Sequence, residues 1–335
     1  MNQTVVARLL GVALALTIST APAALAWADE SSAGERKLCR IDAPELVESS
    51  ALVETAEGWV STNDSGDSAR LFLLDPSTCA ELGQVDWKGE PDDVEALADA
   101  GRGRIWVGDI GDNEAEREGV ELTLVSLADG SVLQRRTLRY PDGPRDAEAM
   151  AAHPVTGEVI VISKSVFGGT VFLVPPQGDR LIELGLVTGL VTDAAFWGPE
   201  RLVVRTYSEA VGYSWPDLTE LGRLKLPGQE QGEGMAVSGD TLLLTSEGID
   251  QPVWRVSIPR AWGTADGADS SAAAGIGQAP PEDSQRGDAT QRSSPESTQT
   301  DPLVEERERR GRRMLITGAI AGVGLLLLLG SLRPR

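Results

Sequence analysis

The stretches Asp93-Val-Glu-Ala-Leu-Ala98, Asp146-Ala-Glu-Ala-Met-Ala151 and Gln231-Gly-Glu-Gly-Met-Ala236 are close copies of one another, and this internal repeat decides the fold. Two weaker copies lie at Glu48–Val53 and Thr192–Phe196. Each copy is followed by a short turn and a run rich in β-branched and aromatic residues, which are typical of strands. Self-similarity with a period of roughly 20–50 residues is typical of solenoids and propellers.

The repeat predicts an all-β fold, a β-propeller of five four-stranded blades over residues 39–260 with about 44 residues in each blade. A β-sandwich would not show such a repeat, and an α/β fold would need helical periodicity between the strands. The fifth copy lacks an outer strand, and we expect Lys37–Ile41 to supply it and close the ring. Closure protects strand edges that would otherwise pair with other chains. Six blades are the alternative, if one long connection contains a degenerate blade.

The two cysteines of the chain fit this closure. Cys39 lies in the expected closing strand, and Cys79 lies in a turn of the first blade. An oxidising compartment allows such a pair to form a disulfide. The loop that it closes would stabilise the fold by roughly 3–4 kcal/mol. We therefore expect a Cys39–Cys79 disulfide, and two free thiols are the alternative.

The N-terminal residues carry a signal for export. Residues 1–26 are typical of a secretory signal peptide, because Arg8 precedes a short apolar stretch and Ala24-Leu-Ala26 offers small residues for cleavage. Cleavage after Ala28 is the nearby alternative, and an uncleaved membrane anchor is the other.

The C-terminal part favours a membrane anchor. Residues 261–304 are rich in Ala, Ser, Gly and Pro without apolar periodicity, and we interpret them as a disordered stalk. Residues 314–332 carry no charge and are long enough to cross a hydrocarbon layer of about 30 Å as a transmembrane helix. The arginines between Arg307 and Arg313 would then lie outside, against the positive-inside tendency, but exported domains cross largely regardless of such charges. The sequence therefore predicts a single-pass protein of the cell membrane with an extracellular propeller.

Composition excludes several classes of function. The chain has 30 basic and 51 acidic residues, a formal charge of −21, and a surface this acidic repels nucleic acid. A single histidine excludes His-based hydrolase triads and HExxH proteases, and two cysteines cannot build a zinc ribbon or an iron–sulfur cluster. We expect a soluble, monomeric propeller domain.

Charged residues recur at matching places in the five copies. The first set lies in the first strand of each copy: Glu48, Glu95, Glu148, Asp193 and Glu233. The second set lies where the second strand ends: Asp64, Asp109, Lys164, Arg205 and Glu247. Matching positions of a propeller form rings around one axis, so we expect these side chains around a central funnel. The candidate ligand-binding residues are Glu95, Glu148, Lys164, Asp193, Arg205, Glu233 and Glu247.

Two loops repeat a D-x-G-D motif, Asp64-Ser-Gly-Asp67 and Asp109-Ile-Gly-Asp112. Oxygen ligands on a glycine-bent loop suit a hard cation such as Ca²⁺. Asp residues also cap tight turns, which is the alternative reading. The sequence predicts a calcium site that involves Asp64, Asp67, Asp109 and Asp112, with Lys164 and Arg205 on the anion-facing side of the funnel.

The strings Trp59–Asp67, Gly108–Asn113, Tyr140–Ala149 and Ser246–Gly248 resemble those of secreted bacterial β-propeller proteins, which are distantly similar to esterase-like phytase and phytase-type propellers. The resemblance covers about residues 39–260. It implies calcium and phosphate-ester hydrolysis at an acidic central face, with Lys164 and Arg205 holding phosphate. It also implies a calcium role for Asp64, Asp67, Asp109, Asp112 and Glu148.

Three functions are consistent with these features. The first is an exported, membrane-anchored propeller that binds an unknown ligand or protein partner through one face. The second is a calcium-dependent hydrolase of phosphate or other esters. The third is a glycosidase with a pair of catalytic carboxylates, although the sequence offers too many carboxylates to choose the pair.

Overall fold

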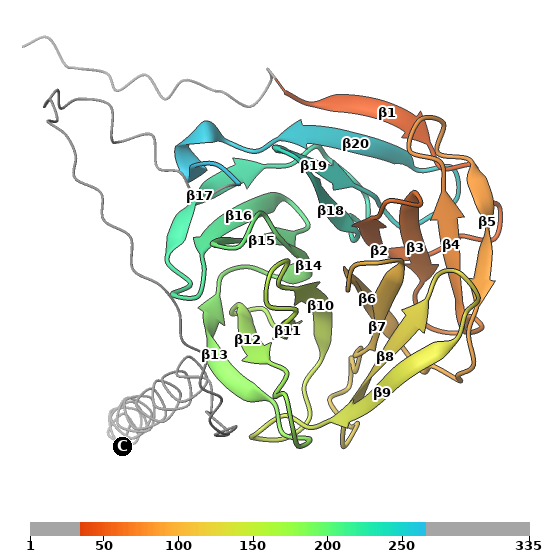
Figure 1. Ribbon diagram of the computed structural model, residues 1–335. Helices are drawn as coiled ribbons and strands as arrows, with labels where there is room; N and C mark the ends of the chain where they lie inside the picture. The colour runs from red at the N-terminus through yellow and green to blue at the C-terminus, as the bar shows by residue number, and fades with distance from the viewer. Residues whose placement is uncertain (1–33, 266–335) are drawn as a thin grey trace, which may run out of the picture.

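A computed structural model describes residues 34–265, which form five sheets of four antiparallel strands around a central channel (Figure 1). This confirms the predicted five-bladed propeller. Blade one contains β2 (Ser49–Glu54), β3 (Trp59–Asn63), β4 (Arg70–Leu74) and β5 (Glu81–Asp86). Blade two contains β6 (Val94–Asp99), β7 (Arg104–Asp109), β8 (Val120–Ser126) and β9 (Val132–Leu138). Blade three contains β10 (Ala147–Ala152), β11 (Val159–Ser163), β12 (Gly169–Leu173) and β13 (Ile182–Val187).

The last two blades complete the ring. Blade four contains β14 (Val191–Phe196), β15 (Arg201–Thr206), β16 (Glu209–Ser214) and β17 (Glu220–Lys225). Blade five contains β18 (Met235–Ser238), β19 (Thr241–Leu244), β20 (Pro252–Ser257) and, on the outside, β1 (Arg36–Arg40). The N-terminal strand β1 pairs with β20, so the first and last strands of the propeller close one blade as expected.

The predicted disulfide reinforces this closure. Cys39 of β1 is bonded to Cys79, which ends the turn between β4 and β5 in blade one, and their Cα atoms lie 5.9 Å apart. Next to it, the backbone N–H of Asp42 donates to the carbonyl of Cys79 at 3.0 Å. Blade five is thus joined to blade one by a covalent bond and by main-chain hydrogen bonds.

The burial of the strands follows their distance from the axis. The innermost strands β2, β6, β10, β14 and β18 contact one another around the channel, and most of their residues are buried. Outer strands such as β5 alternate between half-buried and exposed residues, because one of their faces meets solvent. Strands that converge on an axis leave little room between them, which explains why the repeat is rich in Ala.

A β-bulge recurs in the innermost strand of blades one to four. The pairing with the second strand shifts by one residue at Ser50, Glu95, Glu148 and Thr192. A bulge leaves the extra residue unpaired and redirects its side chain. The acidic residue of the repeat motif therefore occupies a backbone position built for pointing a side chain away from the sheet.

The propeller extends beyond the predicted boundaries of 39–260. A short 3-10 helix, η2 (Arg260–Trp262), buries Trp262 against β17. The Nε of Arg201 donates to the carbonyl of Trp262 at 2.7 Å, and the same guanidinium donates to Thr264. Residues 261–265 thus belong to the propeller and not to the stalk that was predicted to begin at residue 261.

The remaining predicted segments lie outside the described residues. These are the signal peptide at 1–26, most of the stalk at 261–304 and the transmembrane helix at 314–332. Within residues 34–265, no helix is long and apolar enough to cross a membrane.

Candidate functional site

The central channel has two unlike ends. The innermost strands all begin at one end, which we call the acidic end, and all finish at the other, which we call the pocket end. Buried leucine and methionine side chains of these strands, such as Leu97 and Met150, lie between the two ends. Charged side chains gather at the acidic end, whereas the pocket end is hollow and lined by both polar and apolar residues.

The charged residues of the acidic end form one electrostatically linked group, which we call the central cluster. Its members are Asp64, Asp93, Glu95, Glu148, Lys164, Tyr207, Glu233 and Glu247. Six of these side chains are carboxyls and one is an ammonium group. Five of the predicted ligand-binding residues belong to this cluster: Glu95, Glu148, Lys164, Glu233 and Glu247.

Three carboxyls of the cluster lie close enough to share one ion. Asp64, Asp93 and Glu95 each offer an oxygen within 4.8 Å of the others, and Asp64 and Asp93 are hydrogen-bonded to each other. Gly111 makes room for them, since a Cβ at this position would stand 2.3 Å from Oδ2 of Asp93 and 2.9 Å from Cγ of Glu95. We call these three residues the carboxylate trio.

Burial and mutual repulsion favour the protonated form of Glu95 and Asp93 in the absence of a cation. Burial raises the pKa of Glu95 to about 10, and the charges of Glu148 and Asp64 add to the effect. Burial and a hydrogen bond that the Asp93 carboxyl donates to Asp64 raise the pKa of Asp93 to about 7. Glu95 is only 6% exposed, and its carboxyl accepts no hydrogen bond within residues 34–265. A buried carboxyl without a partner must either hold a proton or meet a positive charge.

A second arm of the cluster surrounds Lys164. The ammonium of Lys164 donates to Oε1 of Glu148 at 2.5 Å and to the hydroxyl of Tyr207 at 3.3 Å. Tyr207 is in turn hydrogen-bonded to Glu233. Burial raises the pKa of Glu148 to about 8 even though Lys164 lowers it, and burial also raises the pKa of Glu233. These four side chains form a continuous polar chain next to the trio.

Asp193 and Arg205 lie apart from this cluster and connect blades four and five. Arg205 is fully buried, and its guanidinium donates to the carbonyl of Thr245 at 2.9 Å and to Gln229 Oε1 at 2.7 Å. Asp193 is also buried and accepts hydrogen bonds from the N–H groups of Ala194 and Met235. Burial lowers the pKa of Arg205 to about 10 and raises that of Asp193. Both side chains thus bind groups between blades four and five, and Nε of Arg205 is buried there without a hydrogen-bond partner within residues 34–265.

The strand registers correct the expected rings. In blade one the position of Glu95 and Glu148 is held by Ser50, whereas Glu48 precedes β2 and is exposed. In blade four this position is held by Thr192 and not by Asp193. The alignment of short motifs was wrong by one or two residues there, because Ser and Thr hold the bulge position in these two blades and the alignment matched the nearest acid instead.

The two D-x-G-D loops are also offset from each other. Asp109 in blade two is equivalent to Asn63 in blade one and not to Asp64. Asp109 pairs with Val94 and Asn63 pairs with Ser49, and each of these partners directly precedes the bulge of its strand. Their roles match as well. Asp109 accepts the N–H of Asp93 at 3.0 Å and Asn63 accepts that of Glu48 at 3.0 Å. Each side chain thus fixes the loop that leads into an innermost strand.

Three of the four predicted calcium ligands lie outside the carboxylate trio and bind other groups of the protein. Asp109 is paired with Arg117 at 2.8 Å, and Asp67 accepts a hydrogen bond from Nε of Arg70 at 2.8 Å. Asp112 accepts the backbone N–H groups of Glu116 and Arg117, each at 2.9 Å. Only Asp64 of the predicted set joins the carboxylate trio.

The sequence analysis missed Asp93, Tyr207 and Gly111. A signal for Asp93 was present, because two copies of the repeat begin with Asp two residues before the central Glu, at Asp93 and Asp146. Nothing in the spacing marked Tyr207, which enters the cluster from the end of β15.

Comparison with known proteins finds distant similarity. No protein-family model and no curated protein matches the sequence. Among solved structures, glutaminyl cyclase from Myxococcus xanthus is 12% identical with a TM-score of 0.45, over 67% of this chain and 97% of that one. The soluble aldose sugar dehydrogenase of Escherichia coli is 13% identical with a TM-score of 0.42, over 67% and 99%.

A third similar structure, hydrazine synthase from Kuenenia stuttgartiensis, is 10% identical with a TM-score of 0.37 over 62% of this chain. This chain spans 57% of the length of that one. The likeness in all three cases is distant, and none of these proteins' activities extends to this chain.

Proposed function

We propose that the acidic end is a ligand-binding face whose carboxylate trio holds a divalent cation, Ca²⁺. In this proposal the protein is a monomeric binding propeller, exported and held at the cell membrane by its C-terminal segment, and it presents this face outside the cell. The bound cation and the polar chain around Lys164 together receive the ligand or partner.

One observation carries the proposal: the buried, unpartnered carboxyl of Glu95 next to Asp64 and Asp93. The three oxygens come from three separate positions on blades one and two, and Gly111 keeps the space around them open. Oxygen ligands of this kind suit a hard cation, and calcium accepts irregular coordination more readily than magnesium does. Calcium is also abundant outside cells, which agrees with the proposed location.

The predicted ligands outside the trio have a supporting role in this proposal. Asp109 holds the backbone N–H groups of Asp92 and Asp93, and so it fixes the segment from which Asp93 and Glu95 project. Asp67 and Asp112 order the two loops that flank the site. The residues of the D-x-G-D motifs would thus position the cation site without contacting the cation, except for Asp64.

Two features support display of the acidic end outside the cell. A disulfide between Cys39 and Cys79 is typical of proteins that fold in an oxidising compartment. The described chain ends at Ala265, whose backbone lies against Gly198 in the turn between β14 and β15, on the side of the pocket end. A C-terminal tether would therefore leave the propeller at the end opposite to the carboxylate trio.

Calorimetric titration of the full-length protein with CaCl₂, after metal has been removed with a chelator, tests the proposal. We expect one calcium ion per chain, and at least tenfold weaker binding in Glu95→Gln, which keeps the shape of the side chain but removes its charge. The matched control is Glu200→Gln, an exposed carboxyl near the pocket end. Absence of calcium binding, or equal binding by the wild-type protein and Glu95→Gln, would refute the cation site.

Calcium-dependent ester hydrolysis is a second candidate, favoured by the position of Lys164 beside the trio. Its ammonium is partly exposed and held between Glu148 and Tyr207, where it could bind the oxygen of a phosphate or carboxylate ester. Hydrolysis of p-nitrophenyl phosphate or p-nitrophenyl acetate that stops on chelation and in Lys164→Met would support an enzyme. Calcium binding without any hydrolysis would leave the binding function alone.

A further inference from the structure

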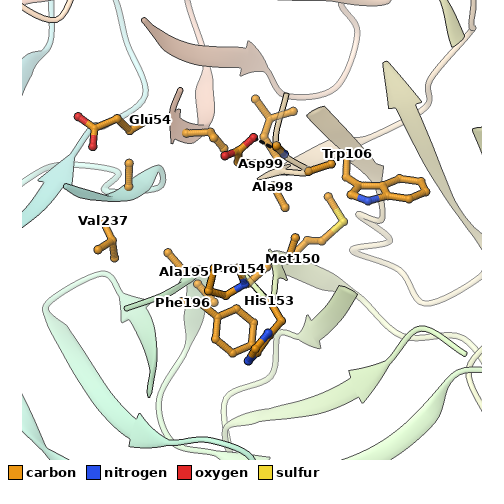
Figure 2. A pocket seen from close by; sticks show the side chains of 18 of the residues that line it. Glu54, Ala98, Asp99, Trp106, Met150, His153, Pro154, Ala195, Phe196 and Val237 are labelled. Atoms are coloured by element: carbon orange, nitrogen blue, oxygen red, sulfur yellow. Dashed lines mark hydrogen bonds between the residues drawn. The ribbon is translucent and has the colours of Figure 1, made fainter. Parts of the chain in front are cut away.

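The pocket end contains a cavity of about 570 Å³ that the functions above do not use. It is lined by the last residues of all five innermost strands and by the turns that follow them (Figure 2). This volume lies within the range of roughly 300–1,000 Å³ that is typical of sites for small molecules. No residue of the central cluster lines the cavity.

The repeat explains why this end is hollow. The last position of the repeat motif is alanine in four of the five blades: Ala98, Ala151, Ala195 and Ala236. Small side chains at the places where five strands converge leave a space that larger residues would fill. The innermost strands also lie at one edge of their sheets, so that their free main-chain edge borders the channel.

An aromatic wall stands on one side of the cavity. Phe196 packs edge-to-face on His153 with ring centroids 5.0 Å apart, and on Trp215 at 5.1 Å. Both ring nitrogens of His153 have partners, because Nε2 is hydrogen-bonded to the carbonyl of Pro199 at 2.9 Å while Nδ1 accepts the N–H of Thr156 at 3.0 Å. The wall therefore offers a fixed aromatic surface.

Two carboxylates stand on the opposite side, as Figure 2 shows for Glu54 and Asp99. Oε1 of Glu54 accepts the hydroxyl of Ser238 at 2.9 Å, and Oδ1 of Asp99 accepts the N–H of Gly101 at 2.7 Å. Within residues 34–265, the second oxygen of each has no hydrogen-bond partner. Arg104, the one basic residue of the lining, donates to the carbonyls of Ala100 and Gly101, so its guanidinium is occupied in the turn.

We propose that this cavity binds a small organic cation, a protonated amine with an apolar body. The apolar body would lie against Phe196 and the alanine-lined wall, and the ammonium group would face Glu54 and Asp99. This site is distinct from the carboxylate trio and does not depend on calcium.

Isothermal titration calorimetry of the full-length protein with 2-phenylethylamine tests the proposal, with 2-phenylethanol as the neutral control. We expect measurable binding of the amine and much weaker binding of the alcohol. Asp99→Asn should weaken binding of the amine by roughly three- to fivefold, because an exposed ion pair contributes modestly. Asp240→Asn, a matched exposed carboxyl in the turn between β18 and β19 outside the lining, should leave it unchanged.

Two further variants locate the amine. Ala195→Leu fills the cavity and should abolish binding, and its circular dichroism and melting curve show whether the fold is intact. Glu247→Gln removes a carboxyl of the central cluster and should leave binding unchanged. No binding of the amine, equal binding of the alcohol, undiminished binding by a folded Ala195→Leu, or loss of binding in Glu247→Gln would each overturn the proposal.

Discussion

The two ends of the central channel are built by the same five strands and by the same repeat, yet they differ in chemistry. Where these strands begin, Glu95, Glu148 and Glu233 bring carboxyls together. Where they finish, small residues such as Ala98 and Ala236 line a cavity of mixed polar and apolar character. The repeat motif has an acid near its start and an alanine at its end. In the propeller the acids therefore gather at one end of the channel and the alanines line the cavity at the other. The difference shows that one short repeat can specify two unlike sites, because ring closure superimposes its copies.

The largest effect is expected from removal of the disulfide, which tests whether both ends depend on ring closure. Replacing Cys39 and Cys79 together by alanine should lower the free energy of unfolding by roughly 3–4 kcal/mol. Urea denaturation measures the loss, and reduction of the wild-type protein with dithiothreitol should reproduce it. Unchanged stability in both experiments would show that the closing strand is held by its β-sheet pairing alone.

Truncation of the partition between the two ends comes next. Met150 is fully buried, lines the cavity and packs on Gly108, whose Cβ would stand 3.2 Å from its Cε. Met150→Ala should lower the free energy of unfolding in urea by about 3 kcal/mol, because the cavity that it leaves cannot collapse fully. Calcium affinity should not change. Leu133→Ala on the exposed face of β9 is the control, and an equal loss there would show that Met150 has no special role.

A slightly smaller effect is expected at the acidic end alone. Calcium at 100 times its dissociation constant should stabilise the wild-type protein by about 2.7 kcal/mol, because it binds only the folded state. Differential scanning calorimetry should show this gain abolished in Glu95→Gln. Asp109→Asn should reduce it, since Asp109 fixes the backbone of Asp93. Identical melting curves in calcium and in chelator would refute the calcium site at the acidic end. The two ends would then not differ in their response to metal.

A pH dependence of stability is also expected, and the groups that cause it lie at the acidic end. Burial and neighbouring acids raise the pKa of Glu95 to about 10, of Glu148 to about 8, and of Asp93 and Glu247 to about 7. The metal-free folded state thus holds protons that the unfolded chain releases. The stabilisation is complete below the unfolded pKa values near 4 and is lost as the pH rises through 7–10.

In chelator, therefore, unfolding in urea should become easier between pH 6 and pH 8. Glu95→Gln should flatten this dependence, and calcium should remove it in the wild-type protein. Stability that rises over this interval in chelator would contradict protonated Glu95 and Asp93 in the folded state. Carboxyls with lowered pKa values, such as Asp67, change the stability only below pH 4 and do not contribute between pH 6 and pH 8.

The extent to which the sequence predicted these features follows from the kind of information that a repeat carries. Period and strand composition were enough for the five blades, the closing strand and the disulfide, because these depend on the order of elements along the chain. The ring of charges was only partly predicted. Glu95 and Glu148 were placed correctly, whereas Glu48 and Asp193 were not, because Ser50 and Thr192 hold the equivalent position and the nearest acid lies two residues before or one residue after it.

The pairing of charges was harder still to predict. The sequence predicts that Arg205 binds an anionic ligand, but in the structure its guanidinium donates hydrogen bonds to carbonyl groups of blade five. Asp109 and Asp112 appear as metal ligands, yet they bind backbone N–H groups of their own loops. Such choices depend on which groups lie nearby in three dimensions, and spacing along the chain does not contain that information.

The closure of blade five also determines how the propeller would respond to mechanical force. Strand β20 leads to the C-terminal end of the described chain and lies between β1 and β19. A pull on residue 265 would first have to free Trp262, and would then act along β20, so that two ladders of hydrogen bonds are loaded in shear at once. The disulfide passes this load from β1 to blade one. A chain tethered through its C-terminus would in this way keep both mouths of the channel intact under tension.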